Sequence, residues 1–300
     1  MKSCNTFIEY HTTDSLQKHA PVFKKLTSYS AVVNAIAITP DGKKAITGSN
    51  NHTCVLWDLA SRKPIKTLKG HTFWVVAVAV SPDGKLAMSA SWDETCILWD
   101  LGNGKSLKTL KGHADVVNAV AFTPDGKKAV SVSNDRTCIL WDLESGNPLI
   151  TFKGHSGGIN AMVICNYGKG ILTASTNDTC ILWDLGSGKH LKTLKGHTDN
   201  VYAVAVTLDG KQALSASWDQ TCILWNLQSG KPIETLRHGS EVLAVSITPD
   251  GKQALTGCWD GKCILWDLGS GKILSSFKGH TDSVNAVIVT PDGKTGAIGI

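Results

Sequence analysis

A histidine, a serine or threonine and an aspartate recur together along this chain, in the same order each time. One such group is His71, Ser89 and Asp93, and Trp99 follows it closely. Ser, His and Asp are the residue types of a hydrolytic triad, in which the His activates the Ser hydroxyl for attack on an acyl carbon. The group returns in further stretches, however, and an active site need not be copied. The repetition therefore favours a structural role, and we expect no catalytic residue among these side chains.

The elements that position these residues are set by an internal repeat. The tryptophans of "LWD" or "LWN" fall at positions 57, 99, 141, 183, 225 and 266, so that successive units are 42 or 41 residues long. Within a unit, runs such as "VVAVAV" and "CILWDL" have strand length and strand composition. Segments such as "SPDGK" and "LGNGK" between them carry turn chemistry. Each unit therefore predicts four short strands and no helix.

The strands lack the alternation of a half-exposed sheet, which indicates that each small sheet is covered on both faces. Sheets stacked radially in this way form a β-propeller. The "GH … WD" unit of this period resembles the WD-repeat β-propeller family, in the style of near-identical bacterial repeats. The resemblance covers residues 22–300 and implies an all-β, seven-bladed β-propeller with four antiparallel strands per blade.

The expected organisation is a single domain over residues 1–300, with six full repeats at about 28–278 and a partial seventh repeat at 279–300. That last unit stops in its second strand. Residues 6–26 contain "TFIEY" and "PVFKKL", which match a third and a fourth strand, and we expect them to close the last blade. Closure would leave no exposed sheet edge. The alternative is that the chain is a piece of a longer array.

The resemblance also implies a hydrogen-bonded set of four residues in each regular blade, in which buried polar groups satisfy one another beside a Trp indole. Carried over by position, the four sets are His71, Ser89, Asp93 and Trp99; His113, Ser131, Asp135 and Trp141; His197, Ser215, Asp219 and Trp225; and His238, Thr256, Asp260 and Trp266. Asn51 and Asn177 replace the Asp in the first and fourth units.

Of the ten tryptophans, six are the repeated ones of "LWD" or "LWN" and four are not. Three of these four immediately precede a turn Asp, and Trp74 precedes the first Val of its strand. In WD-repeat propellers these positions, and the one after that Val, look out from the top face. The predicted partner-binding residues are Trp74, Val76, Trp92, Asn200, Tyr202, Trp218, Glu241, Leu243 and Trp259. Trp and Tyr are enriched among binding hot spots. The alternative is that the rings only stack on each other.

We therefore expect a non-catalytic scaffold that binds a protein or peptide through an aromatic top face. A second hypothesis is a sensor or regulatory arm of a larger signalling or defence effector, and a third is an enzyme with its site in the channel. The third lacks support from any metal cluster, phosphate loop or unrepeated acid–base pair. We expect no cofactor and no metal.

The charge and the cysteine content limit which class of partner and which cellular compartment we expect. The net charge is only +5, and three of the 30 basic residues are Arg, which argues against nucleic acid and against a phosphate-directed site. Lysines of the "PDGK" and "GSGK" turns are expected on the opposite rim, as a solvated face or as a basic docking ring. The cysteines form no C-x-x-C pair, no apolar run could insert into a membrane, and no secretory signal is visible, so we expect a cytoplasmic location.

Overall fold

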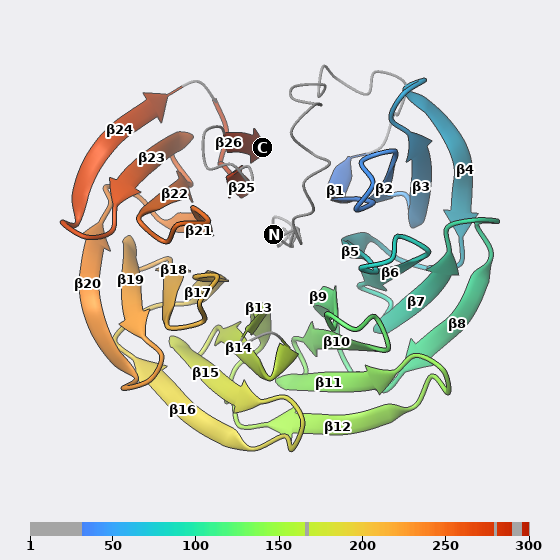
Figure 1. Cartoon of the computed structure of the whole chain (residues 1–300), viewed down its shortest axis with the longest axis horizontal. Coiled ribbons are helices and arrows are strands. Elements are labelled where there is room, and N and C mark those ends of the chain that lie inside the picture. Colours follow the sequence, from blue (N-terminus) through green and yellow to red (C-terminus); the bar gives the residue numbers. More distant parts are fainter. Residues whose placement is uncertain (1–31, 166–167, 279–280, 290–295, 300) are drawn as a thin grey trace. The chain divides into compact units, whose positions relative to one another are not determined.

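The computed structural model describes residues 32–165, 168–278, 281–289 and 296–299, and consists of short antiparallel strands joined by tight turns. The chain divides into two compact units, residues 1–151 and 152–300, and each is considered separately. Each sheet is termed a blade, and the blades are numbered 1 to 7 in chain order (Figure 1).

Unit 1 contains three four-stranded blades, each with its strands in sequence order. Blade 1 comprises β1 (Val33–Ile38), β2 (Lys44–Ser49), β3 (Thr53–Asp58) and β4 (Lys63–Lys69). Blade 2 comprises β5 (Val75–Val80), β6 (Leu86–Ser91), β7 (Thr95–Asp100) and β8 (Ser106–Lys111). Blade 3 comprises β9 (Val117–Phe122), β10 (Lys128–Ser133), β11 (Thr137–Asp142) and β12 (Pro148–Lys153), and the end of β12 passes the unit boundary.

Unit 2 contains three further four-stranded blades and a two-stranded sheet. Blade 4 comprises β13 (Ile159–Cys165), β14 (Gly170–Ser175), β15 (Thr179–Asp184) and β16 (His190–Lys195). Blade 5 comprises β17 (Val201–Val206), β18 (Gln212–Ser217), β19 (Thr221–Asn226) and β20 (Lys231–Arg237). Blade 6 comprises β21 (Val242–Ile247), β22 (Gln253–Cys258), β23 (Lys262–Asp267) and β24 (Lys272–Lys278), and blade 7 has β25 (Ala286–Val289) and β26 (Gly296–Gly299).

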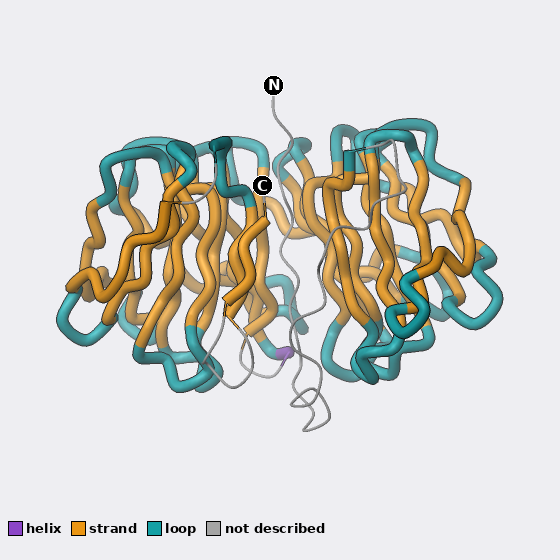
Figure 2. The backbone as a smooth tube through the Cα atoms, turned by 90° about the horizontal axis from the view of Figure 1, so that it is seen from above, coloured by secondary structure: helices purple, strands orange, loops and turns teal. Residues whose placement is uncertain are grey.

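The predicted fold class is confirmed: the described chain is all-β, with six four-stranded antiparallel sheets and a seventh, two-stranded one, as in a seven-bladed β-propeller. The turns gather at the two ends of the strands within each unit (Figure 2). Residues 6–26, expected to supply closing strands, lie outside the described residues, so closure and the single-domain division stay predictions.

The turns follow the chemistry of their residues. After β1, Thr39 Oγ1 donates to Asp41 Oδ1 at 2.6 Å, and the same carboxylate oxygen accepts the Lys43 amide at 3.0 Å. Gly42 has a φ of 68°, a backbone conformation that glycine adopts without steric strain because it has no Cβ. Related side-chain bonds recur at Ser81, Thr123, Thr207 and Thr248. One local motif therefore sets the same hairpin in successive blades.

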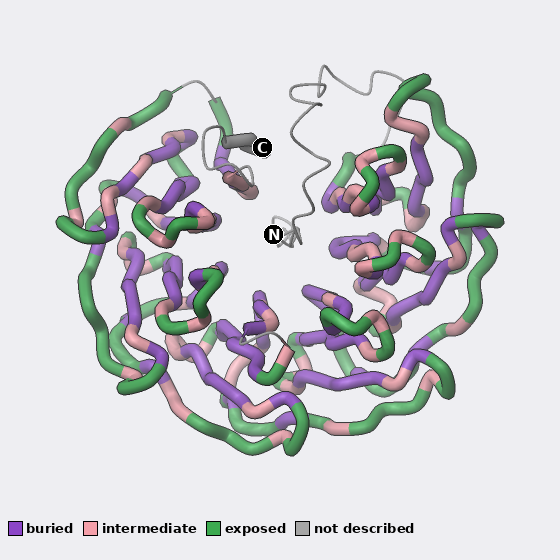
Figure 3. The backbone as a smooth tube through the Cα atoms, in the orientation of Figure 1, coloured by how far each residue is buried: buried purple, intermediate pink, exposed green. Residues whose placement is uncertain are grey.

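Neighbouring blades within a unit share their core. In unit 1, Leu68 of blade 1 is buried with Ile97, Trp99 and Leu101 of blade 2. The second and third strands are buried along most of their length, whereas the fourth strand exposes most of its residues (Figure 3). The third strands also bury a thiol each, at Cys54, Cys96, Cys138, Cys180, Cys222 and Cys263. Burial raises the pKa of the Cys54 and Cys96 thiols to about 12, so they are inert core groups.

Candidate functional site

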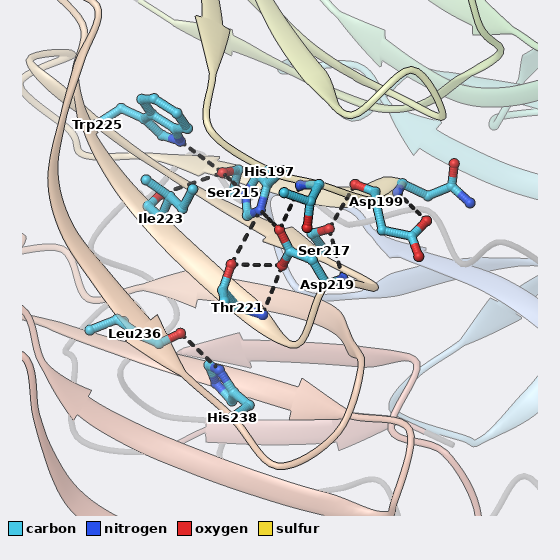
Figure 4. Close-up of polar contacts among 12 residues, drawn as sticks. His197, Asp199, Ser215, Ser217, Asp219, Thr221, Ile223, Trp225, Leu236 and His238 are labelled. Atoms are coloured by element: carbon cyan, nitrogen blue, oxygen red, sulfur yellow. Dashed lines mark hydrogen bonds and ion pairs between the residues drawn. The ribbon is translucent and has the colours of Figure 1, made fainter.

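The predicted set of four residues comes together fully in blades 2, 3 and 5. In blade 5, His197 Nδ1 donates to Asp219 Oδ2 at 2.8 Å, and Ser215 Oγ lies 2.7 Å from His197 Nε2 (Figure 4). Trp225 Nε1 donates to the same hydroxyl at 2.7 Å. The sets of His71 and His113 have the same bonds at 2.7–2.8 Å.

The connectivity of these sets is that of a hydrolytic triad, but their serines are closed to substrate. Ser89, Ser131 and Ser215 are 0% exposed, and each hydroxyl also accepts a Trp N–H. Burial opposes ionisation of Asp93, but hydrogen bonds from His71 and Thr95 hold the pKa of its carboxyl well below the ordinary value. The three sets are therefore satisfied structural networks, with no access for an acyl group.

The fourth predicted set is only partly assembled. His238 Nε2 lies 3.0 Å from Thr256 Oγ1, and Trp266 Nε1 donates to that oxygen at 3.1 Å. Asp260, predicted as a member, bonds instead to the Lys262 ammonium, and His238 Nδ1 faces the Leu236 carbonyl oxygen (Figure 4). Two local changes explain the difference. The glycine that precedes His197 has no counterpart before His238, and Lys262 stands where other blades have a Thr that donates to the Asp.

Blade 4 has Asn177 in place of the Asp, and this changes the electrostatics of its histidine. His155 Nδ1 lies 3.2 Å from Asn177 Oδ1, and Nε2 lies 2.8 Å from Thr173 Oγ1. Burial lowers the pKa of His155 to about 4, and burial likewise lowers the pKa of His238 to about 4. Both histidines therefore remain neutral in the folded chain at pH values at which a free imidazole is protonated.

The predicted partner-binding residues occupy three positions at the end of each blade where the second strand turns into the third. The first and third positions are joined by a backbone bond: Trp92 N donates to Trp74 O at 3.0 Å, Trp218 N to Asn200 O at 3.0 Å, and Trp259 N to Glu241 O at 2.9 Å. The middle position is a β-bulge on the first strand, occupied by Val76, Tyr202 and Leu243 in blades 2, 5 and 6. The three positions therefore form one patch per blade.

The bulge buries two residues that were predicted to face a partner. Val76 is 0% exposed and Leu243 is 9% exposed, so neither offers a surface and both predictions are corrected. A bulge re-aims its side chain, and at this position it turns toward the next blade, as Asn34 Nδ2 shows by donating to Val75 O at 3.0 Å. A short aliphatic group is covered there, whereas the larger Tyr202 stays partly exposed.

In unit 2 the patches of blades 5 and 6 form an open group, here termed the aromatic corner: Tyr202, Trp218 and Trp259. Tyr202 stacks on Trp218 with ring centroids 5.0 Å apart and planes at 16°. Trp218 and Trp259 meet at 75° with centroids 6.4 Å apart. Trp218 is 37% exposed and Trp259 is 41% exposed.

In unit 1 four rings lie in contact, here termed the aromatic stack: His52, Phe73, Trp74 and Trp92, of which Phe73 is 43% exposed. Phe73, Trp74 and Trp92 contact one another in a triangle: Trp92 is 5.9 Å from Phe73 at 8° and 4.8 Å from Trp74 at 31°, and Phe73 is 5.8 Å from Trp74. His52 stacks on Phe73 at 5.7 Å. Trp74 and Trp92 are consequently only partly exposed. The indole nitrogen of Trp92 is buried, and among the described residues it has no hydrogen-bond partner.

Phe73 and His52 were missed by the sequence reasoning. Both could have been found by aligning the units, since Phe73 stands where blades 3 and 5 have Asp115 and Asp199, and His52 stands where blade 2 has Glu94. His52 also has a φ of 69°, as do the residues after the turn Asp or Asn in other blades. No group of three or more His, Cys, Asp or Glu within the described residues could hold a metal ion. Nor does that part of the chain contain a helix long and apolar enough to cross a membrane.

Comparison with known families agrees with the repeat. The family described as "WD domain, G-beta repeat" matches residues 21–58, 62–100, 104–142, 146–184, 188–226, 230–267 and 271–298. A search of curated proteins gave no match. The seven matches account for most of the chain.

Proposed function

Because the chain belongs to the WD-repeat family, whose members generally mediate protein–protein interaction and are usually non-catalytic, we propose that it is a non-catalytic scaffold that binds a protein or peptide through its exposed aromatic residues. The aromatic corner is the main contact of this proposal. The aromatic stack is a second proposed contact, on unit 1.

The exposure of Trp218 and Trp259 on adjacent blades carries this proposal. Blades 1, 3 and 4 place Asn50, Asn134 and Thr176 at the same position, so the turn itself does not require a tryptophan. Leaving a large apolar side chain in water forgoes about 2 kcal/mol of burial free energy. Exposed aromatic groups on neighbouring elements are typical of interfaces. A partner that covers both rings would recover that free energy.

Two of the other predicted residues fit this surface by position. Asn200 and Glu241 accept the backbone bonds of Trp218 and Trp259 and lie beside them, with polar side chains suited to hydrogen bonds at the rim of an interface. Trp74 and Trp92 remain proposed contacts of unit 1, through the parts of their rings that the stack leaves exposed.

The test is a comparative pull-down from lysate of the source organism, with the wild-type chain and a Trp218→Ser, Trp259→Ser variant as baits. The matched control is Leu208→Ser, which removes a side chain that is 68% exposed in the turn between β17 and β18, at the other end of the same strands. We expect partners that are retained by the control and lost from the Trp variant. A partner list identical for all three baits, each verified as folded by circular dichroism, would contradict the proposal.

A further inference from the structure

The charges beside the aromatic corner are mostly negative, and the Lys262 ammonium near Trp259 is paired with the Asp260 carboxylate. Glu241 is joined to Trp259 by the backbone bond at 2.9 Å, and its Oε2 accepts a bond from Ser240 Oγ at 2.9 Å. Asp199 precedes Asn200, and its Oδ1 accepts the Asn200 amide at 2.7 Å. Asp178 lies in the corresponding turn of blade 4. Burial raises the pKa of its carboxyl, and the nearby Asp199 and Asp219 carboxylates raise it further.

Lys262 follows Trp259 by three residues and pairs with Asp260, and the patch positions themselves carry no basic side chain. We consider the three patch positions of blades 4, 5 and 6, the residue before each patch, and the residue after each turn Asp or Asn. These positions contain Asp178, Asp199 and Glu241 but no Lys or Arg. The same positions of unit 1 contain Arg136 and His52 beside Glu94 and Asp115. A chain of net charge +5 thus presents a local negative field at its most exposed tryptophans.

We propose that the aromatic corner, with Glu241 beside it, binds an arginine side chain of a protein partner. This inference rests on the proposed function and names the chemistry that it recognises. A guanidinium is attracted to the faces of indole and phenol rings. It is planar, more weakly hydrated than an ammonium group, and able to donate two parallel hydrogen bonds to a carboxylate. Trp218, Trp259 and Glu241 supply both kinds of partner on neighbouring blades.

A lysine is a weaker match, because its compact ammonium group is strongly hydrated and cannot stack. A neutral aromatic or aliphatic side chain would contact the rings but would leave the Glu241 carboxylate to be desolvated without a partner. An anionic ligand would be repelled by the three carboxylates. The guanidinium is the group that uses both the rings and the charge.

The test measures peptide binding directly, with no identified partner required. The chain is labelled with 5-fluorotryptophan, and the fluorine resonances of Trp74, Trp92, Trp218 and Trp259 are assigned from single Trp→Phe variants. The probes are acetyl-Gly-Arg-Gly-amide, its lysine counterpart and its citrulline counterpart, which keeps the shape of arginine without the charge. Each is titrated to about 10 mM, since a single side chain binds weakly.

We expect the arginine peptide to shift the Trp218 and Trp259 resonances and to leave those of Trp74 and Trp92 in place. Binding should weaken about two- to fivefold in Glu241→Gln, which removes one charge without changing the shape. It should weaken by a similar factor in Trp218→Phe, since benzene is a poorer cation acceptor than indole. The fluorine spectrum of each variant reports its folding in the same experiment.

Equal shifts with citrulline and arginine, tighter binding of lysine, or no shift at Trp218 and Trp259 would each overturn the inference. Its failure is distinct from failure of the proposed function. If the pull-down partner is lost in the Trp218→Ser, Trp259→Ser variant but the arginine peptide shifts neither resonance, the corner binds a protein by another group. If neither variant loses a partner, the proposed function fails first.

Discussion

The aromatic stack of unit 1 and the aromatic corner of unit 2 use the same positions of the same repeat and reach opposite results. Trp92 and Trp218 both precede a turn Asp, and each donates its backbone N–H to the residue before the first strand. In blade 2, however, Phe73 and Trp74 cover the indole of Trp92, whereas in blade 5 the equivalent residues are Asp199 and Asn200. The scaffold sets the place of the ring, and two neighbouring side chains decide whether it is packed or presented.

The largest expected difference between the two regions is in stability. Trp92→Ala should lower the free energy of unfolding by about 3 kcal/mol, because the ring is packed against both Phe73 and Trp74. Trp259→Ala should change it by less than about 1 kcal/mol, because the side chain is already 41% exposed and meets Trp218 only edge to face. Urea unfolding of the two variants measures both values. Equal losses would remove the distinction between stack and corner.

The next largest expected effect is a loss of stability at low pH that originates in unit 2. His155 and His238, both in unit 2, have a folded pKa of about 4, below the ordinary 6.5, so the unfolded chain takes up their protons first as pH falls. Their contribution is fully present above pH 6.5 and is lost between about pH 6.5 and 4, by about 2 kcal/mol per histidine at pH 5.

Asn177→Asp is the matched variant for this effect, since it gives blade 4 the carboxylate that blade 5 has at Asp219. The new carboxylate should raise the pKa of His155, so that the variant loses about 2 kcal/mol less than wild type between pH 7 and pH 5. Urea unfolding at the two pH values gives the comparison. If variant and wild type lose the same free energy, the neutral state of His155 is not the cause.

Phe73→Asp should expose Trp92 more, as Trp218 is exposed in the aromatic corner, because it introduces the residue that blades 3 and 5 have at this position. Loss of the ring contact with Trp92 is expected to cost about 1 kcal/mol. Acrylamide quenching of the Trp92 fluorescence, isolated in a chain whose other exposed tryptophans are Phe, should rise. Quenching that stays at the wild-type level would mean that Trp74 alone covers Trp92.

The smallest effect is expected from Trp92→Phe. The substitution removes packing but also removes the buried indole N–H that has no acceptor among the described residues. Loss of an unsatisfied donor is favourable, so the net change should stay within about 1 kcal/mol. Thermal unfolding compared with Trp92→Ala measures this. A loss as large as that of the alanine variant would mean that the N–H finds an acceptor in solution.

The strands and the polar sets were accessible from the sequence because both depend on local, repeated features. Turn residues such as Asp41 and Gly42 act on their own hairpin, and the spacing from His197 to Ser215, Asp219 and Trp225 is copied from unit to unit. A repeated spacing does not reveal a unit in which one side chain bonds differently, however. Lys262 diverts Asp260 through a single long side chain, which no strand pattern encodes.

The candidate surface was less accessible, because it depends on where side chains point. Val76 and Leu243 each occupy a bulge, a one-residue irregularity in register, and both side chains are buried there. Trp218 is more exposed than Trp92 because different rings and side chains surround them. These residues were considered one at a time in the sequence, so these contacts could not be predicted. The positions could be predicted, and their accessibility could not.

The row of buried thiols in the third strands has a kinetic consequence. Cys96 and Cys222 lie at the same place in their blades, and burial raises the pKa of both. A thiol reagent can reach such a group only when its blade opens, and the reactive thiolate forms only then. Because the residue, the strand and the depth repeat, differences in alkylation rate between these cysteines measure opening alone. The alkylation rate of each third-strand cysteine therefore reports the opening rate of its own blade, in blades 1 to 6, and mass spectrometry of the alkylated peptides measures all six rates in one experiment.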